Sequence, residues 1–235
     1  HHSGNWGGAL ADPAAILAHA VAAIVDPRGR ILVEDWLPGE IPPKVRELIA
    51  GLELAPVPGD PEIDRGWGEP GLSVPEKLFA WSSFAVLAMQ SGRPDAPVNA
   101  ISGEAVANCQ LRYVVGVDPA RIIPALRAHL DRAGFGLVEV VPSDRGAFSP
   151  SRTAPDNPWV DFVRGSIMET TWKKAAALPN FGGSLPNEVF TETLGLPTIW
   201  IPHSHPACNQ HAPNEHMLEE LAREGLAIMT GLFWD

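Results

Sequence analysis

The sequence is poor in cysteine and in basic side chains. Its 235 residues include only two cysteines, Cys109 and Cys208, which lie too far apart for the disulfide framework of a small secreted domain. Lys and Arg number 17 against 28 Asp and Glu, so the formal net charge is −11. Nucleic acids and anionic membranes are bound by clustered basic side chains, and the sequence has no such cluster. Neither is therefore an expected partner.

Long apolar runs are also missing. No apolar stretch reaches the roughly 20 residues that a membrane-spanning helix requires, and no signal-peptide pattern is visible. Together with the low cysteine count, this favours a reducing compartment, and we expect a cytoplasmic protein. The composition, with 45% hydrophobic and 19% charged residues, provides for a sizeable core in one large domain or two modest ones.

Two helices are predicted within residues 1–142 from their start signals. Asp12-Pro13 and Asp118-Pro119 each place an Asp before a Pro, and such an Asp caps the first helical turn while the Pro fits its first position. Apolar residues continue to Val25 in the first case. In the second they recur at helical spacing up to Gly134, which stops the helix. Helices are therefore expected over about 13–25 and from 119 to Gly134.

Strands are predicted by apolar runs and by alternation of apolar and polar residues, over 84–89, 105–115 and 137–141. With a further strand at the start of the chain, the order becomes strand, helix, strand, strand, helix, strand. This order suits an open antiparallel sheet with two helices on one face. The pattern is interrupted after the first helix by a short strand at 31–33, a short helix at 43–51 and a Pro- and Gly-rich surface excursion at 55–75.

The remainder of the chain predicts a linker and a second unit. Residues 143–158 are rich in Ser, Pro, Asp and Asn and lack periodicity, as in a domain linker. Residues 159–235 then predict helices alternating with one buried strand, which is typical of the tail of an α/β sheet domain. The expected elements are helices at 159–174 and 186–194 around a Gly-Gly loop at 180–184, a strand at 198–201 and a final helix.

A histidine-rich loop precedes the final helix and suggests a metal site. His203, His205, Cys208 and His211 lie within nine residues and could form a closed zinc site. Structural zinc sites usually take their ligands as two separated pairs, which favours a second reading. In that reading only His211 binds metal, and Asn214 caps the helix that follows. A solvated loop with incidental histidines is the third possibility.

Four motifs resemble one enzyme family when they are taken together. They are His2-Ser3-Gly4 with Gly7-Gly8, Asn99-Ala100-Ile101 followed by Gln110-Leu111-Arg112, Gly182-Gly183-Ser184-Leu185-Pro186, and His211-Ala212-Pro213-Asn214-Glu215. Their order and spacing resemble those of the dizinc aminoacylase/carboxypeptidase family of metallopeptidases. The motifs extend over nearly the whole chain.

The resemblance implies an α/β architecture in two parts. Residues 1–142 would be a ferredoxin-like lid and dimerisation domain, which agrees with the sheet derived above, and residues 159–235 would be the C-terminal segment of the catalytic domain. The implied enzyme is a hydrolase, a metallopeptidase or deacylase, that cleaves an amide bond of a dipeptide or N-acyl amino acid by zinc-activated water. Two zinc ions per complete active site and a homodimer formed through residues 1–142 are implied as well.

Roles for individual residues follow from the same resemblance. His2 matches a lid histidine that reaches the partner subunit's active site and stabilises the tetrahedral oxyanion, and His211 matches the last zinc ligand. Five further residues match substrate-binding positions: Asn99, Arg112, Gly182, Gly183 and Ser184. The alternatives are a tag remnant for His2, an ordinary strand-face ion pair for Arg112 and a plain turn for the glycine loop.

The chain also departs from the family. Many relatives carry an Arg just before the glycine loop, where this chain has Asn180-Phe181, and this puts specificity for a free α-carboxylate in doubt. The resemblance places the other zinc ligands and the general base in a preceding segment, and none of them precedes His2. We therefore expect a fragment that is inactive alone. The alternative to an enzyme is a different class of function, a noncatalytic dimerisation module.

Overall fold

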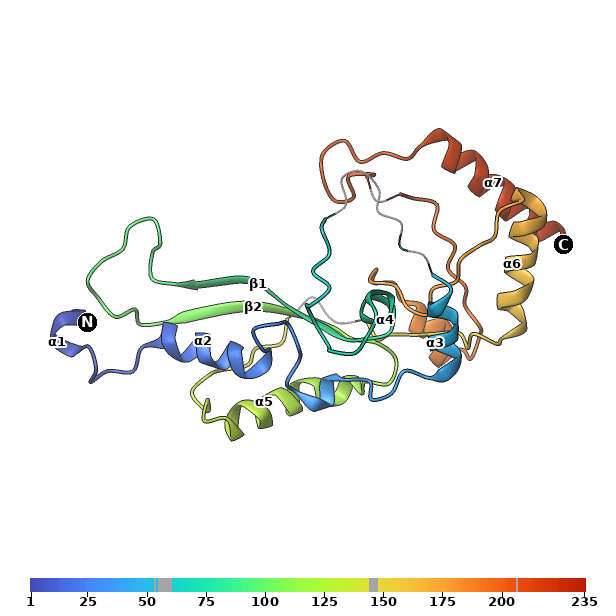
Figure 1. The fold of residues 1–235 in the computed structure, drawn as a ribbon. Coiled ribbons are helices and arrows are strands. Elements are labelled where there is room, and N and C mark those ends of the chain that lie inside the picture. Colours follow the sequence, from blue (N-terminus) through green and yellow to red (C-terminus); the bar gives the residue numbers. More distant parts are fainter. Residues whose placement is uncertain (53, 55–60, 144–147, 206) are drawn as a thin grey trace. The chain divides into compact units, whose positions relative to one another are not determined.

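A computed structural model describes residues 1–52, 54, 61–143, 148–205 and 207–235 (Figure 1). The chain divides into two compact units: unit 1 contains residues 1–41 and 64–150, and unit 2 contains residues 42–63 and 151–235. Parts of the predicted surface excursion (55–60) and of the predicted linker (144–147) lie outside the described residues. None of the described helices is long and apolar enough to cross a membrane.

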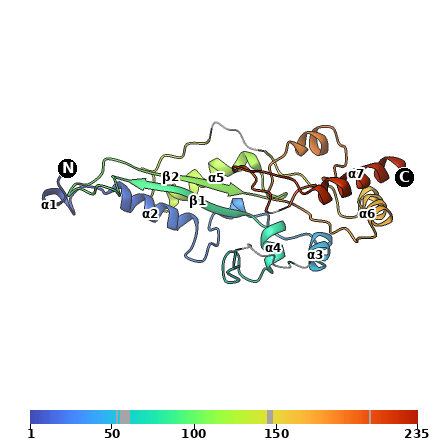
Figure 2. The same ribbon diagram turned by 90° about the horizontal axis from the view of Figure 1, so that it is seen from above.

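Unit 1 is built on an antiparallel β-hairpin with helices on one face. Its strands are β1 (Ser83–Ser91) and β2 (Ala105–Arg112), paired from Ser83 opposite Arg112 to Ser91 opposite Ala105, with a bulge between Val86 and Ala88. Figure 1 shows α2 (Pro13–Ile24) and α5 (Ile122–Arg132) along one side of the hairpin, and Figure 2 shows the hairpin from above. The helical elements are α1 (Ser3–Trp6), α2 (Pro13–Ile24), η1 (Glu34–Trp36), α4 (Val74–Phe79), η2 (Pro119–Arg121) and α5 (Ile122–Arg132).

The core of unit 1 lies between the hairpin and its helices. Trp36 is almost fully buried; its ring lies 5.7 Å from that of Phe84, and its indole N–H donates to the carbonyl of Ile122 at 3.0 Å. This bond satisfies the one polar group of a large apolar side chain. The other buried members of the core are Ala20, Ile24, Ile31, Val33, Ala125 and Leu130.

The start signals of α2 and α5 act as predicted. The Asp12 carboxylate accepts from the backbone N–H of Ala14 at 2.9 Å, and Asp118 accepts likewise from Ala120 at 2.9 Å. The two helices predicted within residues 1–142 outside the interruption are confirmed, as are the strands predicted over 84–89 and 105–115. Helix α4 was missed. Its Ser73–Glu76 capping box is a recognisable start signal, but it falls at the end of the predicted excursion.

Three predicted strands are wrong, so the described residues do not contain the four-stranded sheet. The chain start forms α1 with one isolated bridge, and residues 31–33 contribute only the bridge between Ile31 and Val25. At 137–141 the alternation is real, because Val138 and Val140 pack on the core while Leu137 is 85% exposed. Alternation reports burial on one side, whereas a strand also needs a backbone partner.

A tight turn after α2 depends on one carboxylate. Asp26 accepts from the backbone N–H groups of Arg28 (2.8 Å) and Arg30 (2.9 Å), and these bonds hold the pKa of Asp26 below its ordinary value of 3.8. Within the turn Gly29 has φ +79°, and a Cβ there would lie 2.3 Å from the Trp67 ring. Glycine is therefore required at position 29 both by the positive φ and by the close approach of the Trp67 ring.

The turn makes stability depend on pH. A carboxylate whose pKa is lowered on folding stabilises the protein at pH values above its unfolded pKa, and this contribution is lost as pH falls through the folded pKa. We expect Asp26→Ala to lower the Tm by a few degrees at pH 7, with the difference from the wild type disappearing below pH 3.8. Thermal melts followed by circular dichroism measure this, with Asp95→Ala as an exposed control. A difference independent of pH would contradict the assignment.

Unit 2 contains α3 (Pro43–Ala50), α6 (Pro158–Thr171), a π-helical turn η3 (Val189–Thr193) and α7 (Glu219–Trp234). The inclusion of residues 42–63 in this unit was not foreseen. An ion pair between Lys44 and Asp156 joins the two segments and lowers the pKa of that carboxyl. Helices α6 and α7 pack closely because α7 has Gly231 at the contact, where a Cβ would lie 2.3 Å from Thr170 Oγ1.

The helices predicted at 43–51 and 159–174 and the final helix are confirmed, and the one predicted at 186–194 is reduced to the π-helical turn η3. Two details of this region are wrong. Residues 198–201 form no strand, and Asn214 does not cap α7, because the helix begins at Glu219 after Leu218. Asn214 instead has φ +64°. Asn adopts this left-handed conformation readily in turns.

Candidate functional site

The structure brings two of the predicted site residues together in unit 1. The N-terminal segment runs antiparallel to the hairpin loop: the Ser3 N–H donates to the Asn99 carbonyl at 3.0 Å, and the Ile101 N–H donates to the His1 carbonyl at 2.8 Å. His2 forms the isolated bridge with Ala100 between them. These bonds hold His2 and Asn99, both exposed, at one end of the hairpin, where Figure 1 shows α1.

A hydrogen bond to the His2 imidazole indicates which of its two ring nitrogens can act as a donor. Its Nδ1 accepts from the Gly4 N–H at 3.1 Å and so caps α1. An accepting Nδ1 in a neutral imidazole leaves the proton on Nε2. The exposed Nε2–H is therefore free to donate a hydrogen bond. This is the state that a donor to a developing oxyanion requires.

Arg112 lies at the opposite end of the hairpin from His2 and Asn99. It closes β2 opposite Ser83, whereas the loop that carries Asn99 joins the other ends of the strands. The eight residues of β2 extend over about 25 Å. One chain therefore does not present both His2 and Arg112 to a single small substrate.

The predicted glycine loop belongs to unit 2. Gly182, Gly183 and Ser184 are exposed, and a Cβ on Gly183 would lie 3.0 Å from the Trp200 ring. Trp200 also packs edge-on against Phe181, with ring centroids 5.6 Å apart. The loop backbone at Gly183 thus packs against an aromatic side chain, and the three loop residues are exposed.

His211 lies in a turn with an uncommon backbone. It has φ +64°, between Asn209 (φ +57°) and Asn214 (φ +64°), and it is exposed. Such a conformation costs a non-glycine residue roughly 1–2 kcal/mol, and histidine is among the residues that adopt it more often in turns. The turn is held by the Ala212 N–H, which donates to the Asn209 carbonyl at 2.9 Å.

The other residues of the histidine loop do not join His211. His203 lies against Gly225 of α7, and the His205 ring packs edge-on against His216 at 5.3 Å. Cys208 is buried. Within the described part of the chain, no three His, Cys, Asp or Glu side chains are grouped so that they could hold a metal ion.

The described residues thus do not fit a dizinc centre. The four-ligand site of His203, His205, Cys208 and His211 is not assembled, and that alternative is wrong for this structure. His211 is the one family-matched ligand position, and one imidazole does not constitute a zinc site.

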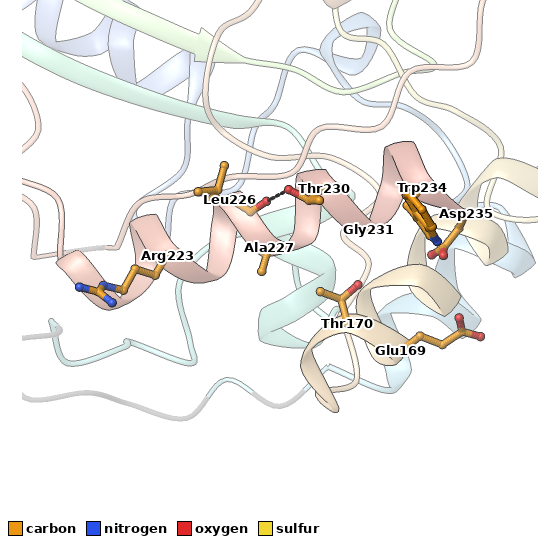
Figure 3. A pocket seen from close by; sticks show the side chains of 9 residues that line it. All are labelled: Glu169, Thr170, Arg223, Leu226, Ala227, Thr230, Gly231, Trp234 and Asp235. Atoms are coloured by element: carbon orange, nitrogen blue, oxygen red, sulfur yellow. Dashed lines mark hydrogen bonds between the residues drawn. The ribbon is translucent and has the colours of Figure 1, made fainter.

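Unit 2 contains a groove between two of its helices. It has a volume of about 590 Å³ and runs between α6 and α7 (Figure 3). Leu226 and Trp234 provide apolar walls, with Arg223 and Glu169 at its edges. None of the seven predicted site residues lines this groove.

The fold is similar to that of three solved peptidases. The chain matches the M20 family metallo-carboxypeptidase Sso-CP2 from Sulfolobus solfataricus with a TM-score of 0.76 and 22% identity over 98% of the chain. It also matches the di-peptidase Dug1p from Saccharomyces cerevisiae (TM-score 0.70, 16% identity, 99% of the chain) and human carnosine dipeptidase 1 (TM-score 0.66, 15% identity, 99% of the chain). The resemblance inferred from the four motifs is thereby confirmed at the level of the fold.

These matches have a limited extent. The chain covers 54%, 50% and 51% of the three solved structures, so it spans about half their length. The sequence matches no family model, and it matches no curated protein at a significant level.

Proposed function

We propose that this chain is part of a metal-dependent peptidase that cleaves the amide bond of a dipeptide or an N-acyl amino acid. The observation that carries the proposal is the match of nearly the whole chain to half of three peptidases. In this proposal unit 1 is the lid and dimerisation domain, and unit 2 is the C-terminal segment of the catalytic domain. Zinc is the proposed metal.

The proposed roles divide between the units. His2 donates its Nε2–H to the oxyanion of the partner subunit's reaction, and Asn99 and Arg112 contact substrate. The separation of His2 from Arg112 along β2 supports a site shared between two chains. Gly182, Gly183 and Ser184 bind the anionic end of the substrate, and His211 provides one metal ligand. The remaining ligands and the general base would be supplied by polypeptide other than the described residues.

Pairing of two chains is proposed through α2 and the exposed edge of the hairpin. The small side chains of residues 14–23 allow close approach of a second helix, and an unpaired strand edge offers backbone groups for a neighbour. A strictly monomeric species in light scattering at high concentration would contradict this part of the proposal.

The proposal is tested on the full-length protein. Hydrolysis of a panel of dipeptides and N-acetyl amino acids is measured together with metal content by plasma mass spectrometry. We expect bound zinc and cleavage of at least one substrate class, with activity lost on chelation and recovered on adding zinc.

A noncatalytic dimerisation module is the second candidate, and it is favoured by the absence of a grouped ligand set among the described residues. A full-length dimer with no bound transition metal and no hydrolysis across the panel would establish it instead.

A further inference from the structure

Three glycines follow His2 in the N-terminal segment, and the backbone explains two of them. Gly8 has φ +82°, in the left-handed region that favours glycine. A Cβ on Gly7 would lie 2.5 Å from the Ser3 carbonyl oxygen, which accepts from the Gly7 N–H at 2.7 Å. Gly4 has neither constraint, because it lies inside α1 with an ordinary helical backbone.

The helix itself gives no reason for glycine at position 4. Inside a helix glycine is less favourable than alanine, so local stability alone would favour alanine. What an alanine would disturb is the His2 ring. A Cβ on Gly4 would lie 3.1 Å from Cε1 and 3.2 Å from Nδ1 of His2, closer than the optimal separation of nonbonded atoms.

The same close approach provides the hydrogen bond of the imidazole. The Gly4 N–H donates to Nδ1 at 3.1 Å, and within the described residues this is the one hydrogen bond of the His2 ring. The backbone beside His2 is held separately, since the Ser3 N–H donates to the Asn99 carbonyl at 3.0 Å. The hairpin loop thus fixes the main chain at His2, and Gly4 fixes the ring.

We propose that Gly4 is a positioning residue for His2. Because Gly4 has no side chain, the imidazole lies close to its backbone N–H, and this bond keeps the ring proton on Nε2 and sets the direction of the ring. An alanine would force the ring away from the N–H, weaken the bond and allow the other tautomer. This inference rests on the proposed function, because it concerns the orientation of the proposed oxyanion donor.

The kinetic test uses Gly4→Ala in the full-length enzyme with a dipeptide that the enzyme cleaves. We expect kcat to fall by about 10-fold, with KM and zinc content unchanged and the Tm unchanged or higher. A displaced oxyanion donor lowers kcat rather than KM, because the donor acts in the transition state. Asn5→Ala, at an exposed residue of α1, is the matched control. It also raises the helix propensity and adds no atom beside the ring, so both constants should stay unchanged.

A double substitution tests whether Gly4 acts through His2. In His2→Ala there is no imidazole to position, so adding Gly4→Ala should cause no further loss of kcat. An equal loss in the presence and absence of the imidazole would show that Gly4 affects the enzyme in another way, and the proposal would be overturned.

A second measurement does not depend on catalysis. NMR of the protein with ¹⁵N-labelled histidine, at a pH where imidazole is neutral, distinguishes one fixed tautomer from an average of two. The signals of His2 are identified by their loss in His2→Ala. We expect the wild type to have its proton on Nε2 and Gly4→Ala to show averaging. If the enzyme cleaves no peptide but the signals change in this way, the proposed function fails and the positioning of His2 by Gly4 stands.

Two further results would overturn the proposal. Averaged tautomers in the wild type, or an unchanged tautomer in Gly4→Ala, would show that the Gly4 N–H does not hold the ring. In an active enzyme, a changed tautomer with an unchanged kcat would show that catalysis does not use this orientation of His2.

Discussion

His2→Ala in the full-length enzyme is expected to lower kcat by about a hundredfold or more and to leave zinc content unchanged. The bond between Gly4 and Nδ1 leaves the exposed Nε2–H as a donor. A donor to the oxyanion acts most strongly as charge develops, so its loss lowers kcat rather than substrate affinity. Steady-state kinetics and plasma mass spectrometry measure the two quantities. His216→Ala, at an exposed histidine of unit 2, is the control.

Mixing experiments test whether His2 acts across the dimer. A His2→Ala chain is combined with a chain inactivated at its own metal site by His211→Ala. If each active site takes its histidine from the partner subunit, the mixed dimer contains one complete site and regains part of the activity. A mixture that stays inactive although mixed dimers form, as shown by native mass spectrometry, would exclude the cross-subunit role.

His211→Ala is expected to lower metal content and activity together, each by tenfold or more, because imidazole is among the commonest zinc ligands. The backbone at this position has φ +64°, which alanine adopts less readily than histidine, so His211→Ala also strains the turn. His211→Asn separates the two effects, since Asn accepts this conformation and is a poor zinc ligand. Both variants should lose zinc equally.

His216→Ala is the matched control for His211. His216 lies in the same loop and is also exposed, and its Nδ1 bonds to the Asn214 carbonyl at 3.0 Å. Its substitution should leave the metal in place. Zinc retained in His211→Ala would refute the single-ligand assignment, whereas zinc lost in His211→Ala and also in a His203 or Cys208 variant would restore the four-ligand site.

Local signals in the sequence determined most of the helices. The Asp-Pro pairs at 12–13 and 118–119 act within one helical turn, and the structure shows the predicted caps. The alternation over 84–89 and 105–115 likewise predicts the paired strands of the hairpin. These features depend on neighbours in the chain, so one sequence is sufficient to predict them.

Pairing and burial were decided by the tertiary structure. The alternation at 137–141 is correct, yet no strand forms because no described segment provides a backbone partner. Residues 42–63 belong to unit 2 through contacts such as Lys44 with Asp156, which lie far apart in the sequence. The motifs indicated a resemblance to a metallopeptidase family, and the fold is similar to that of a metallo-carboxypeptidase.

For the site, the sequence named His2 and Asn99 separately, and only the structure placed them side by side through backbone bonds. The sequence by itself thus determined the residue types and the local turns. Long-range packing decided which of those residues lie together, because such contacts join residues that are remote along the chain.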